Sequence, residues 1–530
     1  MVPRALGLLL TPLCLAPLAG AAAAQTVPPR SVPPALVVLI AVDQMRADYL
    51  RRHADQWVGG FRRFYGEGTV FEHGRQEHAA TETAPGHATM LSGREPVHTG
   101  IVLNSRGIQD ATSPVLGAND GVGASPRRFQ GTTLYDWMLV QDPEARMLSV
   151  SRKDRAAILM VGRARGPVLW FSGGEFTTSR YYADTLPAWV RAFNARGGVA
   201  RLAGATWDLL RPESAYAESD SMWFENGGRD FLFPHRLPGT ADSVARRIAS
   251  YPWVDSLTLA LALEGAGQLR LGRPPHTDLL AVSLSATDAI GHAFGPDSRE
   301  IHDQLLRVDL WLGQFLDSLA QLVPRSRTVF VLTGDHGVTP MPEYAVVVRH
   351  QRAGRVSLAG YAAEVEATLE RRFRTEFGVT EDNGILTADV DAMRARGVDV
   401  DSLSAALAAE IQRIPGVAAA YTPATLAAAS DSVPEVHLWR RLLPPRFGWL
   451  ICASTKPGYI WSSGTLGTEH GAGNAEDVEV PIAFLGEGIR AQHIARPART
   501  VDIAPTLARL LSVRPTEPLD GVVLQEVLGP

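Results

Sequence analysis

The most informative residues of the sequence are two pairs that each combine an aspartate with a histidine. Asp288 and His292 are four residues apart, Asp335 and His336 are adjacent, and each pair follows an apolar run. Carboxylate oxygen and neutral imidazole nitrogen are suitable zinc ligands, and loops that leave the carboxyl ends of strands can converge on one point. The two pairs together predict a site for two divalent metal ions. Either pair alone is weak evidence, because a helix cap or a loop ion pair explains it as well.

Two further residues extend these pairs to two sets of three ligands. Asp43 ends the apolar run of residues 35–43, and His470 lies in the segment GTEHGAGN. Asp43 alone is explained equally well as a helix N-cap, but beside the other pairs a role as metal ligand is favoured. We expect one metal ion at Asp43, Asp335 and His336, and the other at Asp288, His292 and His470.

Thr83 is the candidate nucleophile. It precedes Ala84, Pro85 and Gly86, and proline is favoured in the first turn of a helix, so the Thr83 hydroxyl is expected at a helix N-terminus. The partial positive charge there favours an alkoxide and an incoming phosphoryl group, and a nearby metal ion would lower the pKa of the hydroxyl. Two alternatives stay open: an ordinary N-cap role for Thr83, and Thr81 as the nucleophile.

Three further side chains could hold the oxygens of a phosphate. Asn104 follows the Thr83 segment and could donate its amide to a substrate oxygen. Lys153 and Arg155 lie two residues apart in SRKDR, so in extended chain they point the same way. Two converging cations suit the non-bridging oxygens of a phosphate monoester. A solvated basic turn is the alternative for this pair.

The runs that precede the candidate residues read as buried strands. Long apolar runs suit strands that are covered on both faces, as in a parallel sheet. Between them lie amphipathic segments, of which Ser298–Leu322 repeats apolar residues at intervals of three and four and predicts a helix. Strands that alternate with helices predict an α/β fold with a mostly parallel sheet flanked by helices. The expected strands lie in residues 35–43, 145–151, 277–286, 327–335 and 478–486.

Two stretches interrupt the alternation of strands and helices. Residues 160–240 are rich in aromatic residues and glycine, and we interpret them as an insertion near the middle of the first core part. Residues 346–460 carry charged helical segments and are predicted to form an inserted cap subdomain. The core is then expected to comprise residues 35–345 and 461–530.

Composition and the N-terminus limit the class of protein. The chain has 530 residues, and its net charge of -5 gives no global case for binding nucleic acid or an anionic membrane surface. Residues 1–24 combine an early arginine, an apolar stretch and three alanines, which is typical of a signal peptide. No later stretch is long and apolar enough for a stable membrane anchor, so we expect a periplasmic or secreted protein. The sequence gives no prediction of oligomeric state.

Cysteine usage agrees with this organisation. The chain has two cysteines, and if Cys14 leaves with the signal peptide, Cys452 has no partner for an internal disulfide. We expect Cys452 to be a buried small hydrophobic residue and not a nucleophile.

Taken together, the chain motifs resemble the alkaline phosphatase superfamily, and most closely its type I phosphodiesterase/nucleotide pyrophosphatase branch. The resemblance rests on Asp43 at a strand end, TETAPGH, Asn104, TDAIGH, TGDHG and TEHGAG, and it covers the chain from about residue 36 to 530. It implies an alkaline phosphatase-like fold, two Zn²⁺ ions held by the two ligand sets, and a covalent phosphothreonine intermediate on Thr83. It also implies that Thr83 contacts the metal ions.

Within this branch, the pair Lys153 and Arg155 and the sequence TAPGH resemble the phosphate-irrepressible alkaline phosphatases. The resemblance implies an exported zinc-dependent alkaline phosphatase that hydrolyses small-molecule phosphate monoesters. A phosphodiesterase or nucleotide pyrophosphatase on the same scaffold is one alternative, and a non-catalytic metal-stabilised binding protein is another. An arylsulfatase is disfavoured, because the C/S-x-P-S-R motif is absent.

Overall fold

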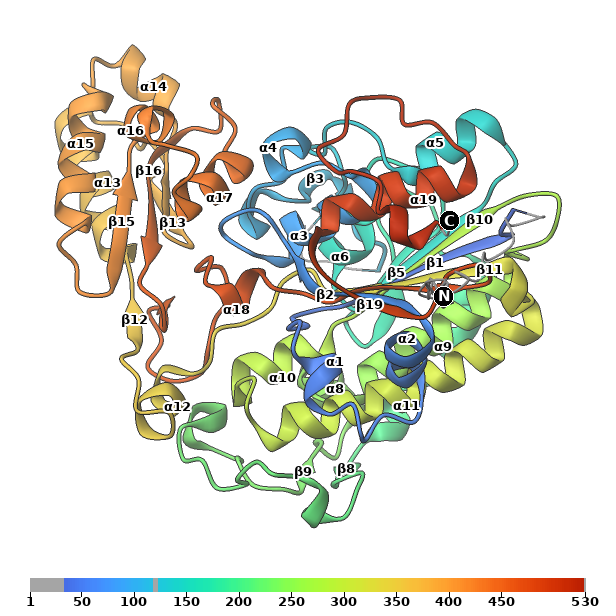
Figure 1. Ribbon diagram of the computed structural model, residues 1–530. Helices are drawn as coiled ribbons and strands as arrows, with labels where there is room; N and C mark the ends of the chain where they lie inside the picture. Colours follow the sequence, from blue (N-terminus) through green and yellow to red (C-terminus); the bar gives the residue numbers. More distant parts are fainter. Residues whose placement is uncertain (1–32, 118–122, 529–530) are drawn as a thin grey trace, which may run out of the picture.

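A large mixed sheet forms the centre of the protein (Figure 1). The computed structural model describes residues 33–117 and 123–528, so the predicted signal peptide of residues 1–24 lies outside the described residues. The sheet has nine strands in the order β19-β2-β18-β11-β1-β10-β5-β6-β7. In that order they are Gln492–Arg499, Thr69–Arg75, Ile482–Gly486, Thr328–Thr333, Leu36–Val42, Asp278–Leu284, Met147–Ser151, Val168–Ser172 and Glu175–Thr177.

Most strands of this sheet run in one direction. β1 is parallel to both β10 and β11, β10 is parallel to β5, and β5 is parallel to β6. β18 is antiparallel to its neighbours β11 and β2, and β7 is antiparallel to β6. The predicted α/β fold with a mostly parallel sheet is confirmed. The strand expected over residues 478–486 is shorter, because β18 comprises only Ile482–Gly486, and it is antiparallel to its neighbours, unlike the strands of the other apolar runs.

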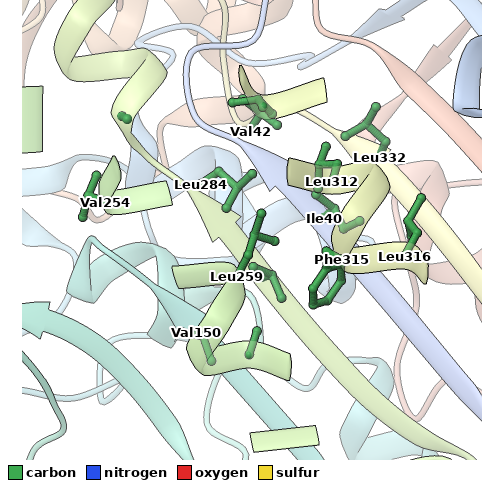
Figure 2. Packing of buried hydrophobic residues seen from close by; sticks show 14 of the residues in the cluster. Ile40, Val42, Val150, Val254, Leu259, Leu284, Leu312, Phe315, Leu316 and Leu332 are labelled. Atoms are coloured by element: carbon green, nitrogen blue, oxygen red, sulfur yellow. The ribbon is translucent and has the colours of Figure 1, made fainter. Parts of the chain in front are cut away.

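The central strands are apolar throughout because helices cover both faces of the sheet. Along β1, Ile40 and Val42 belong to one hydrophobic cluster, whereas Leu39 and Ala41 belong to the other, as alternating side chains require. Figure 2 shows Ile40 and Val42 in the first cluster with Leu312, Phe315 and Leu316 of α11.

The first face carries the helices α2 (Gly60–Glu67), α9 (Trp253–Gln268), α10 (Ala286–Phe294) and α11 (Arg299–Leu322). The second face carries α3 (Thr83–Ser92), α5 (Leu134–Gln141), α6 (Asp154–Leu159) and α19 (Ile503–Leu511). The helix expected at Ser298–Leu322 is α11, and Ser298 is its N-cap, because its Oγ accepts a hydrogen bond from the backbone N of Ile301 at 3.2 Å.

A second lobe, residues 354–461, lies to one side of the main sheet, and we call it the cap lobe (Figure 1). It begins at β12 (Gly354–Val356) and ends at β17 (Tyr459–Trp461), which pair in parallel. Its own sheet has the order β13-β14-β16-β15, comprising Thr380–Asp382, Ile385–Thr387, Trp449–Thr455 and Val417–Tyr421. Its helices are α13 (Ala359–Phe373), α14 (Val390–Ala395), α15 (Val400–Ile411), α16 (Pro423–Ala428) and α17 (Pro434–Leu442). The boundaries 345/346 and 460/461 given above stay a prediction.

Residues 160–240 contribute β6 and β7 to the edge of the main sheet before the chain enters a segment of short elements. That segment includes α7 (Ala188–Ala195), β8 (Thr206–Trp207) and β9 (His235–Arg236), and it leads into α8 (Ala241–Arg247). The remaining α-helices and β-strands of the described residues are α1 (Tyr49–Arg52), α4 (Pro96–Thr99), β3 (Gln109–Pro114), β4 (Gly123–Ala124), α12 (Pro342–Val347) and α18 (Ala475–Val478).

Two observations bear on the remaining expectations. Cys452 lies on β16, is fully buried and is a free thiol, as expected for a small hydrophobic residue. Among residues 33–117 and 123–528, no helix has both the length and the hydropathy that crossing a membrane requires.

Candidate active site

Four adjacent strands of the main sheet carry the candidate residues at their carboxyl ends. Asp43 directly follows β1, and Asp335 lies two residues beyond β11. Asp288 is in the first turn of α10, which follows β10, and Lys153 lies two residues beyond β5. Because β11, β1, β10 and β5 are neighbours and parallel, these side chains meet at one edge of the sheet.

The first ligand set comprises Asp43, Asp335 and His336, all fully buried, with one ligand atom of each lying within 4.8 Å of the others. Asp335 Oδ1 accepts hydrogen bonds from the backbone N of Gln44 and of His336, both at 3.0 Å. His336 Nε2 lies 3.6 Å from Asp43 Oδ1 and 3.5 Å from Asp335 Oδ2. Asp43 Oδ1 and His336 Nε2 are buried and have no hydrogen-bond partner among the described residues.

The second ligand set comprises Asp288, His292 and His470, again with ligand atoms within 4.8 Å of one another. Asp288 Oδ1 lies 3.2 Å from His292 Nε2 and 3.7 Å from His470 Nε2. The two sets are in contact, because the rings of His336 and His470 stack with centroids 3.7 Å apart. The structure therefore brings together the six residues that the sequence divided into the same two sets.

All three histidines are oriented by backbone carbonyl groups. Nδ1–H of His292 donates to Thr468 O at 2.8 Å, Nδ1–H of His336 donates to Gly337 O at 2.9 Å, and Nδ1–H of His470 donates to Thr81 O at 2.7 Å. A histidine that donates from Nδ1 presents Nε2 to the opposite side, which is the usual orientation of a metal ligand. Burial lowers the pKa of His336 and that of His470, which favours the neutral imidazole that a metal requires.

The carboxylates of the site need more positive charge than the protein supplies. Burial raises the pKa of Asp43 well above its ordinary value, and the charges of Asp288 and Asp335 raise it further. Lys153 Nζ lies 2.8 Å from Asp43 Oδ2 and 2.6 Å from Asp288 Oδ2. One ammonium cannot balance three buried carboxylates, and each charge removed from water costs several kcal/mol unless it is paired. The donor set and its charge thus fit two divalent cations.

The raised pKa of His292 also indicates that the site favours bound positive charge. Burial alone would lower this pKa, but the charge of Asp288 and the hydrogen bond to it outweigh burial and raise it to about 9. A proton on His292 therefore partly neutralises Asp288 where no stronger cation is bound.

Thr83 is the first residue of α3, and its hydroxyl faces the two sets. Thr83 Oγ1 accepts a hydrogen bond from Lys153 Nζ at 3.0 Å, and the same ammonium contacts both Asp43 and Asp288. Thr81 instead uses its carbonyl oxygen to orient His470, and its hydroxyl has no partner among the described residues. This arrangement favours Thr83 over Thr81 as the nucleophile.

Gly86 allows α3 to approach the first ligand set. A Cβ atom at Gly86 would lie 2.2 Å from the carbonyl oxygen of Asp335, closer than side chains ever pack. Only glycine lets the first turn of the helix contact the backbone of a candidate ligand. The glycine of TAPGH therefore fixes the position of Thr83 relative to Asp335.

The residues expected to hold phosphate line one cavity of about 480 Å³. Asn104, Lys153 and Arg155 share it with Asp288, His292 and His470. Asn104 Oδ1 also accepts a hydrogen bond from the backbone N of Ala84 at 2.9 Å, which caps the helix that begins at Thr83. Arg155 Nη1 lies 3.9 Å from Asp154 Oδ1, and Arg155 Nε has no hydrogen-bond partner in the described part of the chain.

Three residues of the site were not identified from the sequence. Gln44 joins the two ligand sets, because its backbone N donates to Asp335 and its side-chain Nε2 donates to Asp288 Oδ1 at 3.1 Å. Glu82 is buried beside Thr83, and its carboxylate accepts from the backbone N of Asn104 and from Asn383 Nδ2. Only their positions next to Asp43 and Thr83 could have indicated Gln44 and Glu82. The dipeptide Asn383-Gly384 could have indicated a tight turn, but not its contact with Glu82.

A third group of possible ligands, His53, Glu218 and His302, lies apart from this site. The rings of His53 and His302 stack with centroids 3.7 Å apart and an interplanar angle of 17°. Nearly parallel rings direct their nitrogen lone pairs side by side and not toward one point. We therefore assign no metal to this group.

Comparison with known proteins connects this geometry with one family. Residues 37–468 match the family model described as type I phosphodiesterase/nucleotide pyrophosphatase. Alkaline phosphatase PhoK of Sphingomonas sp is 31% identical over 530 aligned residues, which cover 93% of this chain and 91% of PhoK. Alkaline phosphatase PhoV of Synechococcus elongatus is 29% identical, with 93% of this chain and 92% of PhoV covered.

A solved structure agrees over the same extent. The crystal structure of alkaline phosphatase PafA, a protein of Elizabethkingia meningoseptica, matches with a TM-score of 0.85 at 27% identity, covering 94% of this chain and 99% of PafA. A PafA variant in which one Thr, one Asn, one Lys and one Arg are substituted matches with the same TM-score of 0.85. The substituted Thr and Asn are separated by the same number of residues as Thr83 and Asn104, and the substituted Lys and Arg are two apart, like Lys153 and Arg155.

Proposed function

The chain belongs to the type I phosphodiesterase/nucleotide pyrophosphatase family and is a phosphoric monoester hydrolase, and on that premise we propose that it is an alkaline phosphatase that depends on two zinc ions. The observation that carries the proposal is the position of the Thr83 hydroxyl, which shares the Lys153 ammonium with carboxylates from both ligand sets.

Metal ions would be held by the two sets described above. Asp43, Asp335 and His336 would hold one ion, Asp288, His292 and His470 the other, and Thr83 would contact them. When bound, zinc supplies Lewis acidity, which stabilises negative charge on oxygen and favours an ionised hydroxyl. Zinc fits better than magnesium or calcium, because three of the six side chains are imidazoles and those ions prefer oxygen.

The remaining chemistry belongs to side chains of the protein. The Thr83 hydroxyl loses its proton to solvent and its oxygen attacks phosphorus in line; the bond from Thr83 to phosphorus forms, the bond to the leaving-group oxygen breaks, and that oxygen takes up a proton from water. Lys153, Arg155 and the Asn104 amide hold the phosphoryl oxygens during the transfer, and the N-terminus of α3 adds its partial charge. Water then hydrolyses the phosphothreonine, which releases phosphate and regenerates the hydroxyl.

Lys153 and Arg155 favour a monoester over a diester as substrate, and their removal tests this preference. A monoester presents one more anionic oxygen than a diester, so we expect Lys153→Ala and Arg155→Ala to lower monoester kcat/KM by about 10²-fold or more. Diester kcat/KM should fall much less. Steady-state rates with 4-nitrophenyl phosphate and bis(4-nitrophenyl) phosphate measure the ratio.

The exposed Arg163 provides a matched control in the same segment. Arg163→Ala should leave both rates unchanged. A wild-type enzyme that strongly prefers the diester, together with a Lys153→Ala variant that loses both activities equally, would instead indicate a phosphodiesterase on the same scaffold.

Export from the cytoplasm belongs to the same proposal, because residues 1–24 have the composition of a signal peptide. The protein isolated from its natural host is expected to begin at Gln25, after the three alanines. N-terminal sequencing checks this, and a retained Met1 on the active protein would refute it.

A further inference from the structure

The cap lobe forms the outer wall of the cavity in which phosphate is expected to bind. Lys153, Arg155 and Asn104 line its inner part, beside the ligand sets. The β13–β14 turn region, which includes the last two residues of β13, contributes Glu381, Asp382 and Asn383 to the same cavity. The carboxylates of this turn therefore line the same cavity as the residues that are expected to hold the phosphoryl group.

The turn is held against the active site by Asn383. Asn383 Nδ2 donates to Glu82 Oε1 at 2.6 Å, and Glu82 is the residue directly before Thr83. On its other side, Asn383 packs on Gly471, where a Cβ atom would lie 2.3 Å from Asn383 Oδ1. One side chain of the cap lobe thus touches the neighbours of both the candidate nucleophile and the candidate ligand His470, which fixes the distance of the turn from the reacting groups.

The two carboxylates of the turn are not neutralised within the described residues. Asp382 Oδ2 accepts from Ser105 Oγ at 2.7 Å, and Glu381 Oε1 accepts from the backbone N of Gly384 at 3.1 Å, but neither forms an ion pair with lysine or arginine. Arg106, whose charge acts on Asp382, donates its hydrogen bonds to Thr387 Oγ1 and Phe447 O.

We propose that Glu381 and Asp382 make the enzyme selective for phosphate monoesters whose leaving group carries no negative charge. Each is half-buried, so its charge acts across the cavity with less screening than in water. Like charges brought together in a binding site repel one another and are an effective means of rejecting a substrate. The inference rests on the proposed monoesterase function.

Three monoesters with leaving groups of equal length but different charge test the selectivity. These are 2-hydroxyethyl phosphate, phosphoethanolamine and phosphoglycolate, whose leaving groups are neutral, cationic and anionic. For the wild-type enzyme we expect kcat/KM for phosphoglycolate to be at least about tenfold lower than for 2-hydroxyethyl phosphate. Phosphoethanolamine should be accepted at least as well as the neutral ester.

Carboxamide variants separate this repulsion from the intrinsic reactivity of the esters. In Glu381→Gln/Asp382→Asn, the ratio of the neutral to the anionic ester should narrow by about three- to tenfold. The matched control is Glu364→Gln/Asp391→Asn, which removes two charges from exposed positions of the cap lobe outside the cavity. This control should leave the ratio as in the wild type.

Several outcomes would overturn the inference while leaving the proposed function intact. One is a wild-type enzyme that turns over all three esters equally; another is a Glu381→Gln/Asp382→Asn variant that keeps the wild-type ratio. If that variant fails to fold, the wild-type enzyme still tests the inference. Raising the salt concentration should narrow its ratio of kcat/KM for the neutral ester to kcat/KM for the anionic ester. A ratio that does not change with salt contradicts the inference. Absence of turnover with every monoester would instead overturn the proposed function.

Discussion

Replacing Thr83 by alanine is expected to lower kcat/KM for a phosphate monoester by about 10⁴-fold or more, because the variant lacks the oxygen that accepts the phosphoryl group. The side chain is fully buried at the start of α3, and its hydroxyl contacts Lys153 at 3.0 Å. Loss of one small hydroxyl should leave the fold and the metal content unchanged. Steady-state kinetics, thermal unfolding and metal analysis of one preparation measure the three properties.

Two variants and one trapping experiment make this expectation specific. Thr83→Ser keeps a hydroxyl and should retain measurable turnover, whereas Thr81→Ala should retain far more activity than Thr83→Ala. Acid-quenched wild-type enzyme should carry one phosphoryl group on the peptide that contains Thr83. Turnover that survives in Thr83→Ala would refute the covalent mechanism, and loss of turnover in this variant alone would exclude a non-catalytic binding protein.

The sequence predicted those parts of the site that one short segment can encode. Asp43 and Asp335 each follow an apolar run, and the α/β pattern places the ends of such runs at one edge of the sheet. Asp288 and His292 lie four residues apart on α10, so helix geometry alone places them side by side. The six candidate ligands could therefore be divided into two sets of three without a prediction of the helices that separate them along the chain.

Features that depend on contacts between distant segments were not predicted. Hydrophobic periodicity does not reveal strand direction, and β18 is antiparallel although its sequence resembles that of the parallel strands. The edge strand β19 is largely exposed and polar, so it lacks the apolar run of a central strand. Asn383 reaches Glu82 across 301 positions of the sequence, and an Asn–Gly dipeptide predicts a tight turn but not the surface on which the turn packs.

Removal of the metal ions is expected to abolish monoester turnover, and zinc should restore it. Asp43, Asp288 and Asp335 are at most 4% exposed, and Lys153 forms ion pairs with only two of them, Asp43 and Asp288. Without divalent cations these carboxylates repel one another, so chelation should also lower the thermal unfolding temperature. Activity, metal content and unfolding temperature before and after chelation, and after addition of zinc, test this.

Substitution of single ligands should then resolve the two sites. His336→Ala removes a ligand of the first set only, and His470→Ala removes a ligand of the second set only, so each variant should lose about one of two bound ions. Glu364→Gln, on the exposed surface of the cap lobe, should keep both ions. The ring centroids of His336 and His470 lie only 3.7 Å apart, so the experiment must decide whether the two rings bind one ion or two. If both bind the same ion, the two variants lose the same ion. If each binds its own ion, each variant keeps the ion that the other loses. A purified native protein that contains no metal would contradict the two-zinc proposal at its first step, and two ions retained in both histidine variants would show that the ligand sets are wrongly assigned.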